Sequence, residues 1–289
     1  MSEKVNPLKK LWRLLPFVKD PQPLVTVVDL AGVIGAAGPG RSGLSLKKVE
    51  KALAAAFKPD QVDAVALLIN SPGGSPVQSR LIYSEIRRLA AENDTPVFAF
   101  LEDVGASGGY ILAVAGDEIY ADESSIVGSI GVISGGFGFH EAIARLGIER
   151  RVYTAGDNKS TLDPFVPENP ADIARLETIL ADLHEQFIDL VKERRGDKLA
   201  DNPELFTGAI WTGKAAIENG LIDGTARFNE YIRTRYGKDV KIKKISTEGG
   251  SFLKKLLSGG DAFGARSLLD ADQLLDTAER RALWARFGL

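Results

Sequence analysis

The residues best suited to chemistry surround Ser107, which glycines flank in the stretch 105–110. An apolar run at 96–101 precedes this stretch and predicts a buried strand, and a second run at 111–115 predicts a buried helix. A serine at a tight strand-to-helix turn presents its hydroxyl at a cleft, beside free backbone N–H groups. It can act as a nucleophile, because those N–H groups can stabilise an oxyanion. The alternative is a loop in which Ser107 caps the helix.

A second glycine-rich turn, at 70–75, ends the apolar run 62–69. In α/β folds ligands bind where loops leave the carboxyl ends of parallel strands, so both turns should open onto one cleft. We therefore take the backbone N–H groups of Gly74 and Gly108 as candidates for a two-donor oxyanion hole. The alternative is a pair of tight turns that only begin helices.

The order of the predicted elements is typical of an α/β layer fold with crossover helices. Strands are predicted at 25–30, 62–69 and 96–101, and helices at 46–57 and 77–91. Farther along we predict strands at 118–121 and 149–155, a strand or loop at 126–133, and helices at 140–146 and 170–195.

We divide the chain into three parts. Residues 1–23 form an amphipathic helical segment, residues 24–246 form the main domain, and residues 247–289 form a helical tail with its helix at 268–287. Leu8, Trp12 and Leu15 share one face of the first segment, with basic residues between them. This segment suits peripheral contact with an anionic membrane surface, and it equally suits docking on protein.

Composition excludes several classes of function. The 289 residues are 44% hydrophobic with a net charge of −3, so a sizeable core is expected and nucleic-acid binding is not. The absence of cysteine excludes disulfides, thiolate catalysis and a cysteine metal site. The apolar runs fall short of the ~20 residues of a membrane span, and no signal peptide is visible. We expect a cytoplasmic protein that can lie peripherally at the inner face of the membrane.

A serine nucleophile needs a base, and the sequence offers few. The two histidines, His140 and His184, lie in predicted helices where a structural or solvent-exposed role is expected. The remaining option is a lysine whose pKa is lowered by burial, because desolvation disfavours the ammonium form. Composition does not select one among the 36 lysines and arginines.

Four segments in order resemble the signal peptide peptidase A family of serine peptidases, which includes the SppA and SohB-like proteins. They are residues 69–74 with 105–110, residues 128–132, residues 154–161 and residues 206–224. The resemblance spans about residues 25–225. It implies a ClpP/crotonase-like fold of repeated β-β-α units with crossover helices.

The resemblance also implies roles for particular residues. Ser107 would be the nucleophile and Lys159 the general base of a Ser-Lys dyad, and Ser129 would hydrogen-bond the lysine. Short or unfolded peptides, including remnant signal peptides, would be the substrates. The apolar strands around the cleft favour small or apolar residues beside the cleaved bond. We expect neither a cofactor nor a metal.

Two departures from the family pattern bear on substrate and assembly. Family members usually carry an N-terminal transmembrane helix, which this sequence lacks, so the signal-peptide substrate stays open. The sequence has one copy of the motif set, as in the short members that assemble into rings. We therefore expect a cyclic homo-oligomer in which neighbouring copies supply serine and lysine. The alternatives are a crotonase-like acyl-CoA enzyme and a non-catalytic scaffold at a membrane.

Overall fold

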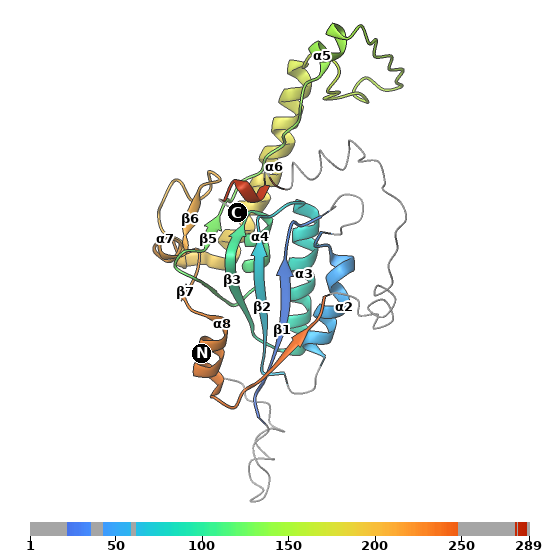
Figure 1. Cartoon of the computed structure of the whole chain (residues 1–289). Coiled ribbons are helices and arrows are strands. Elements are labelled where there is room, and N and C mark those ends of the chain that lie inside the picture. The colour runs from blue at the N-terminus through green and yellow to red at the C-terminus, as the bar shows by residue number, and fades with distance from the viewer. Residues whose placement is uncertain (1–21, 36–42, 59–61, 248–280, 282, 288–289) are drawn as a thin grey trace, which may run out of the picture.

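The computed structural model describes residues 22–35, 43–58, 62–247, 281 and 283–287 (Figure 1). The predicted helix with Leu8, Trp12 and Leu15 lies outside the described residues, as does most of the predicted tail helix at 268–287. Within the described ranges, no helix combines the length and the apolar character that crossing a membrane requires.

A mostly parallel sheet forms the centre of the molecule (Figure 1). Its strands follow the order β6-β5-β3-β2-β1-β8, and β4 pairs with β3 and with β7. Only the β5–β6 pair is antiparallel among the described strand pairs. The strands are β1 Leu24–Ala31, β2 Ala64–Ser71, β3 Val97–Ala106, β4 Glu118–Ala121, β5 Ile126–Gly128, β6 Ile210–Thr212, β7 Gly224–Thr225 and β8 Lys241–Ile245.

Helices cover both faces of this sheet, and each face has its own core. One cluster packs sheet residues such as Leu67 against α2, α3 and α4, and a smaller one packs Phe98 and Phe100 against Ile232 of α8. Burial of these apolar side chains is the main stabilising term. The helices are α2 Leu46–Phe57, α3 Pro76–Asn93, α4 Gly108–Ala113, α5 His140–Arg145, α6 Pro170–Arg195, α7 Gly213–Glu218 and α8 Phe228–Tyr236.

The predicted fold class, α/β with a ClpP/crotonase-like arrangement, is confirmed, but two local predictions need correction. Residues 149–155, predicted as a strand, are exposed and irregular, and no described strand pairs with them. Strand β8 was not predicted because its sequence, Lys-Ile-Lys-Lys-Ile, is too charged for a buried strand. It lies at the sheet edge beside β1, where Lys244 pairs with Asp29 at 2.6 Å.

Residues 131–169 and the first half of α6 form an arm that projects from the body (Figure 1). Most of its residues are exposed. The buried side chains of α6 begin at Phe187 and continue with Leu190, Val191 and Arg195. The predicted amphipathic helix is therefore confirmed, but only its C-terminal half packs against the core.

The C-terminal end of α6 is anchored by a largely buried ion pair. Arg195 donates from Nη1 to Asp223 Oδ2 (2.8 Å) and from Nε to the Gly220 carbonyl (2.8 Å). Lys198 donates to Asp223 Oδ1 (2.6 Å), and the Ile119 amide donates to Oδ2 (2.8 Å). Burial by itself would raise the pKa of Asp223, but hydrogen bonds from Arg195 and Lys198 prevail and lower it.

We predict that Asp223→Asn lowers the free energy of unfolding by about 3 kcal/mol at pH 7, because it leaves the Arg195 guanidinium buried without its counter-charge. The pKa of Asp223 is lower in the folded protein than its unfolded value of about 3.9, so ionised Asp223 stabilises the fold above that pH. This stabilisation is lost as the pH falls through the folded-state pKa. The difference in unfolding free energy between wild type and Asp223→Asn should therefore become smaller at acidic pH. Urea unfolding at neutral and acidic pH measures it.

Asp201→Asn is the matched control, because Asp201 is exposed and should change stability by less than about 0.5 kcal/mol. A difference between wild type and Asp223→Asn that stays constant from neutral to acidic pH would show that the ion pair is not the source.

Candidate active site

Ser107 follows the last residue of β3 and has an unusual backbone conformation. Its φ of 52° and ψ of −123° are rare for a residue with a side chain and mark strain that the surrounding structure must hold. Its amide donates to the Gly128 carbonyl (2.8 Å), which ties it to β5. Its hydroxyl makes no capping hydrogen bond to α4, so the helix-cap alternative is not what the structure shows.

A bulge in β3 directs the end of that strand towards the neighbouring turn. The pairing of β2 with β3 shifts register between Ile69 and Ser71, opposite Leu101 and Gly105. The side chain of Asn70 spans the gap, since its Oδ1 accepts from the Val104 amide (3.3 Å) and its Nδ2 donates to Asp103 (2.6 Å). Asn70 thereby satisfies a backbone group that the bulge removes from the ladder.

The two glycine-rich turns are in direct contact. A Cβ atom on Gly73 would lie 2.7 Å from Ser107 Cβ and 2.8 Å from the Gly108 nitrogen, so only glycine allows this approach. Gly73 and Ser75 bond to Ile34, with the Ile34 amide donating to the Gly73 carbonyl (2.8 Å) and the Ser75 amide donating to the Ile34 carbonyl (2.8 Å).

This arrangement leaves the two predicted oxyanion donors free. Within the described residues, neither the Gly74 amide nor the Gly108 amide donates to a protein acceptor. Both residues line the same cavity as Ser107. Two unpaired N–H groups beside a serine hydroxyl are the elements that stabilise a tetrahedral oxyanion.

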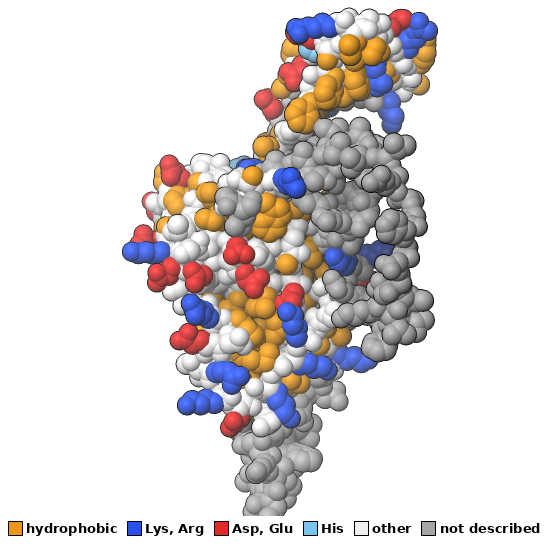
Figure 2. All heavy atoms as spheres, in the orientation of Figure 1, with side chains coloured by type: hydrophobic (Ala, Val, Ile, Leu, Met, Phe, Trp, Pro, Cys, Tyr) orange, Lys and Arg blue, Asp and Glu red, His pale blue; other side chains and the backbone are white. Residues whose placement is uncertain are grey.

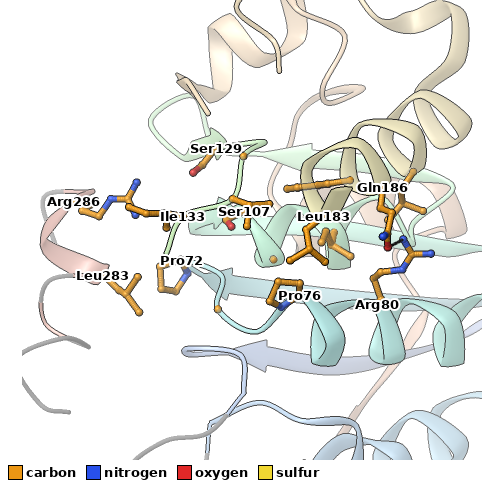
Figure 3. Close-up of a pocket in the computed structure, with 17 residues that line it drawn as sticks. Pro72, Pro76, Arg80, Ser107, Ser129, Ile133, Leu183, Gln186, Leu283 and Arg286 are labelled. Atoms are coloured by element: carbon orange, nitrogen blue, oxygen red, sulfur yellow. Dashed lines mark hydrogen bonds between the residues drawn. The ribbon is translucent and has the colours of Figure 1, made fainter. Parts of the chain in front are cut away.

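The cavity has a volume of about 270 Å³ (Figure 3). Its wall beside Ser107 is apolar and comes from α3, α4 and the buried half of α6, through Pro76, Ile111, Leu183, Phe187 and Leu190. Ser129 also lines it and is buried, with a φ of 52° and its amide donating to the Ala209 carbonyl (2.7 Å).

Lys159 is the one predicted site residue that the structure places elsewhere. It is exposed, in a turn where its amide donates to the Gly156 carbonyl (3.1 Å), and the segment around it lies on the arm (Figure 1). The residues that line the cavity do not include it. Within one chain the structure therefore brings together Ser107, Ser129, Gly74 and Gly108, but not Lys159.

Neither histidine takes the place of the lysine. His184 on α6 has its Nε2 3.1 Å from the Ile130 carbonyl, and His140 begins α5 on the arm. The cavity lining includes neither of them. This agrees with the structural or solvent-exposed roles that the sequence predicts for both.

Sequence reasoning missed several lining residues. Arg80 of α3 and Gln186 of α6 meet at the cavity although they lie 106 positions apart in the sequence. Leu283 and Arg286, near the C-terminal end of the chain, also line it. No local pattern marks such residues, because their contact depends on how α6 and the C-terminal segment fold back over the sheet.

An α/β fold with a serine beside free backbone N–H groups is an arrangement that enzymes acting through a seryl intermediate use. The sequence model of peptidase family S49 matches residues 90–243. The chain belongs to this family.

Individual relatives add detail. A putative protease from Synechocystis is 29% identical over 252 residues, which is 86% of this chain and 87% of that protein. A putative signal peptide peptidase SppA from Enterococcus faecium is 30% identical over 162 residues, 56% of this chain and 47% of that protein.

The Na⁺/H⁺ antiporter NhaA of Brucella melitensis is 52% identical over 271 residues, 92% of this chain. The chain spans only 37% of the length of that protein. Most of the Brucella protein lies outside the match, so the antiporter activity in its name is not assigned to this chain.

We predict that Gly73→Ala disables the site while the protein still folds. The added Cβ would displace Ser107 and the Gly108 amide, and a misplacement near 1 Å can cost about a hundredfold in rate. The measurement is the rate at which a fluorophosphonate labels Ser107. Gly135→Ala is the control, because a Cβ there meets nothing within 4 Å. Equal labelling rates in both variants would show that the turn contact does not position the serine.

Proposed function

We propose that this protein is a serine endopeptidase that hydrolyses short or unfolded peptides. Ser107 is the nucleophile, and the Gly74 and Gly108 amides form the oxyanion hole. The observation that carries this proposal is the placement of the strained Ser107 beside two unpaired backbone N–H groups in one apolar cavity. Membership of peptidase family S49 supports it.

The geometry supports a two-step reaction. Ser107 Oγ bonds to the carbonyl carbon of the peptide while a neutral amine takes its proton, and the carbonyl electrons move onto the oxygen that the Gly74 and Gly108 amides face. The intermediate then collapses, the C–N bond breaks, and the leaving amine takes the proton. Water repeats the sequence on the acyl-enzyme and releases the acid. The apolar wall suits small or apolar residues beside the cleaved bond.

We further propose that Lys159 supplies the neutral amine from a neighbouring copy and that Ser129 hydrogen-bonds it. Lys159 lies on the arm, away from the Ser107 cavity of its own chain, so a partner's arm could bring it there. Figure 2 shows hydrophobic side chains gathered at the outer end of this arm. Exposed apolar residues there include Phe137, Leu146, Ile148 and Tyr153. Such a surface suits a head-to-tail contact, which closes into a ring when its rotation allows.

We predict that Ser107→Ala and Lys159→Ala each lower kcat/KM on a fluorogenic apolar peptide by roughly a thousandfold or more, because nucleophile and base act as one unit. The fluorophosphonate should label wild type at Ser107, as peptide mapping would show. Full peptidase activity in Ser107→Ala would contradict the proposed function.

The pH profile is the companion control. A lysine acts as a base only when neutral, so activity should rise with pH along a single limb. The variants His140→Gln and His184→Gln should keep that shape. A profile governed by a histidine, and lost with either variant, would overturn the assignment of Lys159.

We also predict complementation between inactive chains. In an equimolar mixture of Ser107→Ala and Lys159→Ala chains that exchange subunits, about a quarter of the shared sites receive both intact residues if mixing is random. The mixture should recover up to about that fraction of wild-type activity. A mixture of Ser107→Ala with the double variant should recover none. Absence of recovery after proven exchange would show that each chain completes its own site.

A further inference from the structure

The cavity beside Ser107 carries an unbalanced positive charge. Among the residues that the structure describes, two arginines, Arg80 and Arg286, line it, and no aspartate or glutamate does. Figure 3 shows these arginines on opposite sides of Ser107. A pocket with apolar walls and charge of one sign attracts a ligand group of the opposite sign.

Arg80 lacks the carboxylate partners of its helix neighbours. In the described part of the chain it forms no ion pair, and its hydrogen bond is a long one from Nη1 to Gln186 Oε1 (3.4 Å). By contrast, Arg87 pairs with Asp117 (2.8 Å), and Arg88 pairs with Glu85 and Glu92 (2.6 Å each). Most of the five donors of Arg80 therefore have no acceptor among the described residues.

An apolar trough connects Ser107 to Arg80. Leu183 and Pro76 lie between the two residues in Figure 3, and the buried side chains of Ile111, Phe187 and Leu190 complete the wall. A peptide whose bond sits at Ser107 would place a neighbouring group along this trough with its end at the guanidinium. Arg80 and Gln186 are both exposed, so solvent reaches this end of the trough and a charge-assisted hydrogen bond there gains only the modest free energy of a surface ion pair.

We infer that the active-site pocket recognises a carboxylate of the peptide substrate through Arg80, and this inference rests on the proposed peptidase function. The planar guanidinium binds both oxygens of a carboxylate, and Gln186 adds amide donors beside it. The carboxylate belongs to an acidic side chain near the cleaved bond or to the C-terminus of a short peptide. The preferred substrates are therefore apolar at the cleaved bond and acidic nearby.

The experiment uses a set of peptides made from one neutral apolar parent. Each peptide carries one glutamate, at one of the three positions before or the three positions after the cleaved bond. Each peptide has a glutamine partner, and the parent is made with a C-terminal acid and with a C-terminal amide. In wild type, one glutamate position or the acid terminus should raise kcat/KM by at least roughly fivefold over its neutral partner. The position that responds identifies the source of the carboxylate. The preference should weaken in high salt.

Arg80→Gln should bring that ratio close to one. Arg88→Gln is the matched control, because Arg88 lies on the same helix and is absent from the cavity lining, and it should leave the ratio unchanged. The inference is wrong if wild type cleaves every acidic peptide and its neutral partner with the same kcat/KM. It is also wrong if Arg80→Gln keeps the wild-type preference for the acidic peptide.

Binding to Ser107→Ala separates this inference from the proposed function. Fluorescence anisotropy of the labelled peptides on Ser107→Ala should show the same preference for the acid, and it should be lost in Ser107→Ala/Arg80→Gln. Cleavage that requires Ser107 but ignores charge overturns only the carboxylate assignment. Absence of Ser107-dependent cleavage overturns the peptidase proposal, while the binding ratio still decides the role of Arg80.

Discussion

The contact between Gly73 and Ser107 is the constraint on which the candidate site depends. Parallel strands β2 and β3 end at the same edge of the sheet, and a side chain at residue 73 would push their turns apart. The remaining parts hold this contact in place. The Asn70 side chain accepts a hydrogen bond across the β3 bulge, and the backbone of Ile34 hydrogen-bonds to both sides of Gly74. The Gly128 carbonyl accepts a hydrogen bond from the Ser107 amide. The strain at Ser107 is maintained because these three neighbouring segments determine its backbone together.

Helix α6 does two different things along its length. Its C-terminal half is buried, forms the cavity wall through Phe187 and Leu190, and is anchored by the Arg195–Asp223 pair. Its N-terminal half leaves the body as part of the arm. The same helix therefore supplies an internal wall and, in its outer half, side chains such as Ile179 that stay exposed. Ser107, the proposed nucleophile, lies at the cavity in the body, whereas Lys159, the proposed base, lies on the arm. The proposed reaction therefore needs the lysine of a second copy.

The arginines of this chain differ in whether a carboxylate pairs with them. Arg195 is buried and meets Asp223 at 2.8 Å, so its charge is compensated and its role is to hold elements together. Arg87 and Arg88 are also paired, on the outer part of α3. Arg80 lies on the same helix at the cavity and has an amide for a partner in place of a carboxylate. The proposed recognition of a substrate carboxylate uses this difference, because Arg80 lines the same cavity as Ser107.

The sequence by itself determined the strands that end at the site and the turn residues Ser107, Gly74 and Gly108, because apolar periodicity and glycine placement are local properties of the chain. It failed at residues 149–155, which form no strand because no described strand pairs with them. It also failed at β8, whose lysines are tolerated at a sheet edge beside Asp29. Only the tertiary structure decided that Lys159 lies on the arm and that Arg80 meets Gln186 at the cavity. Both depend on the path of α6 over the sheet, a long-range packing outcome that no local spacing encodes.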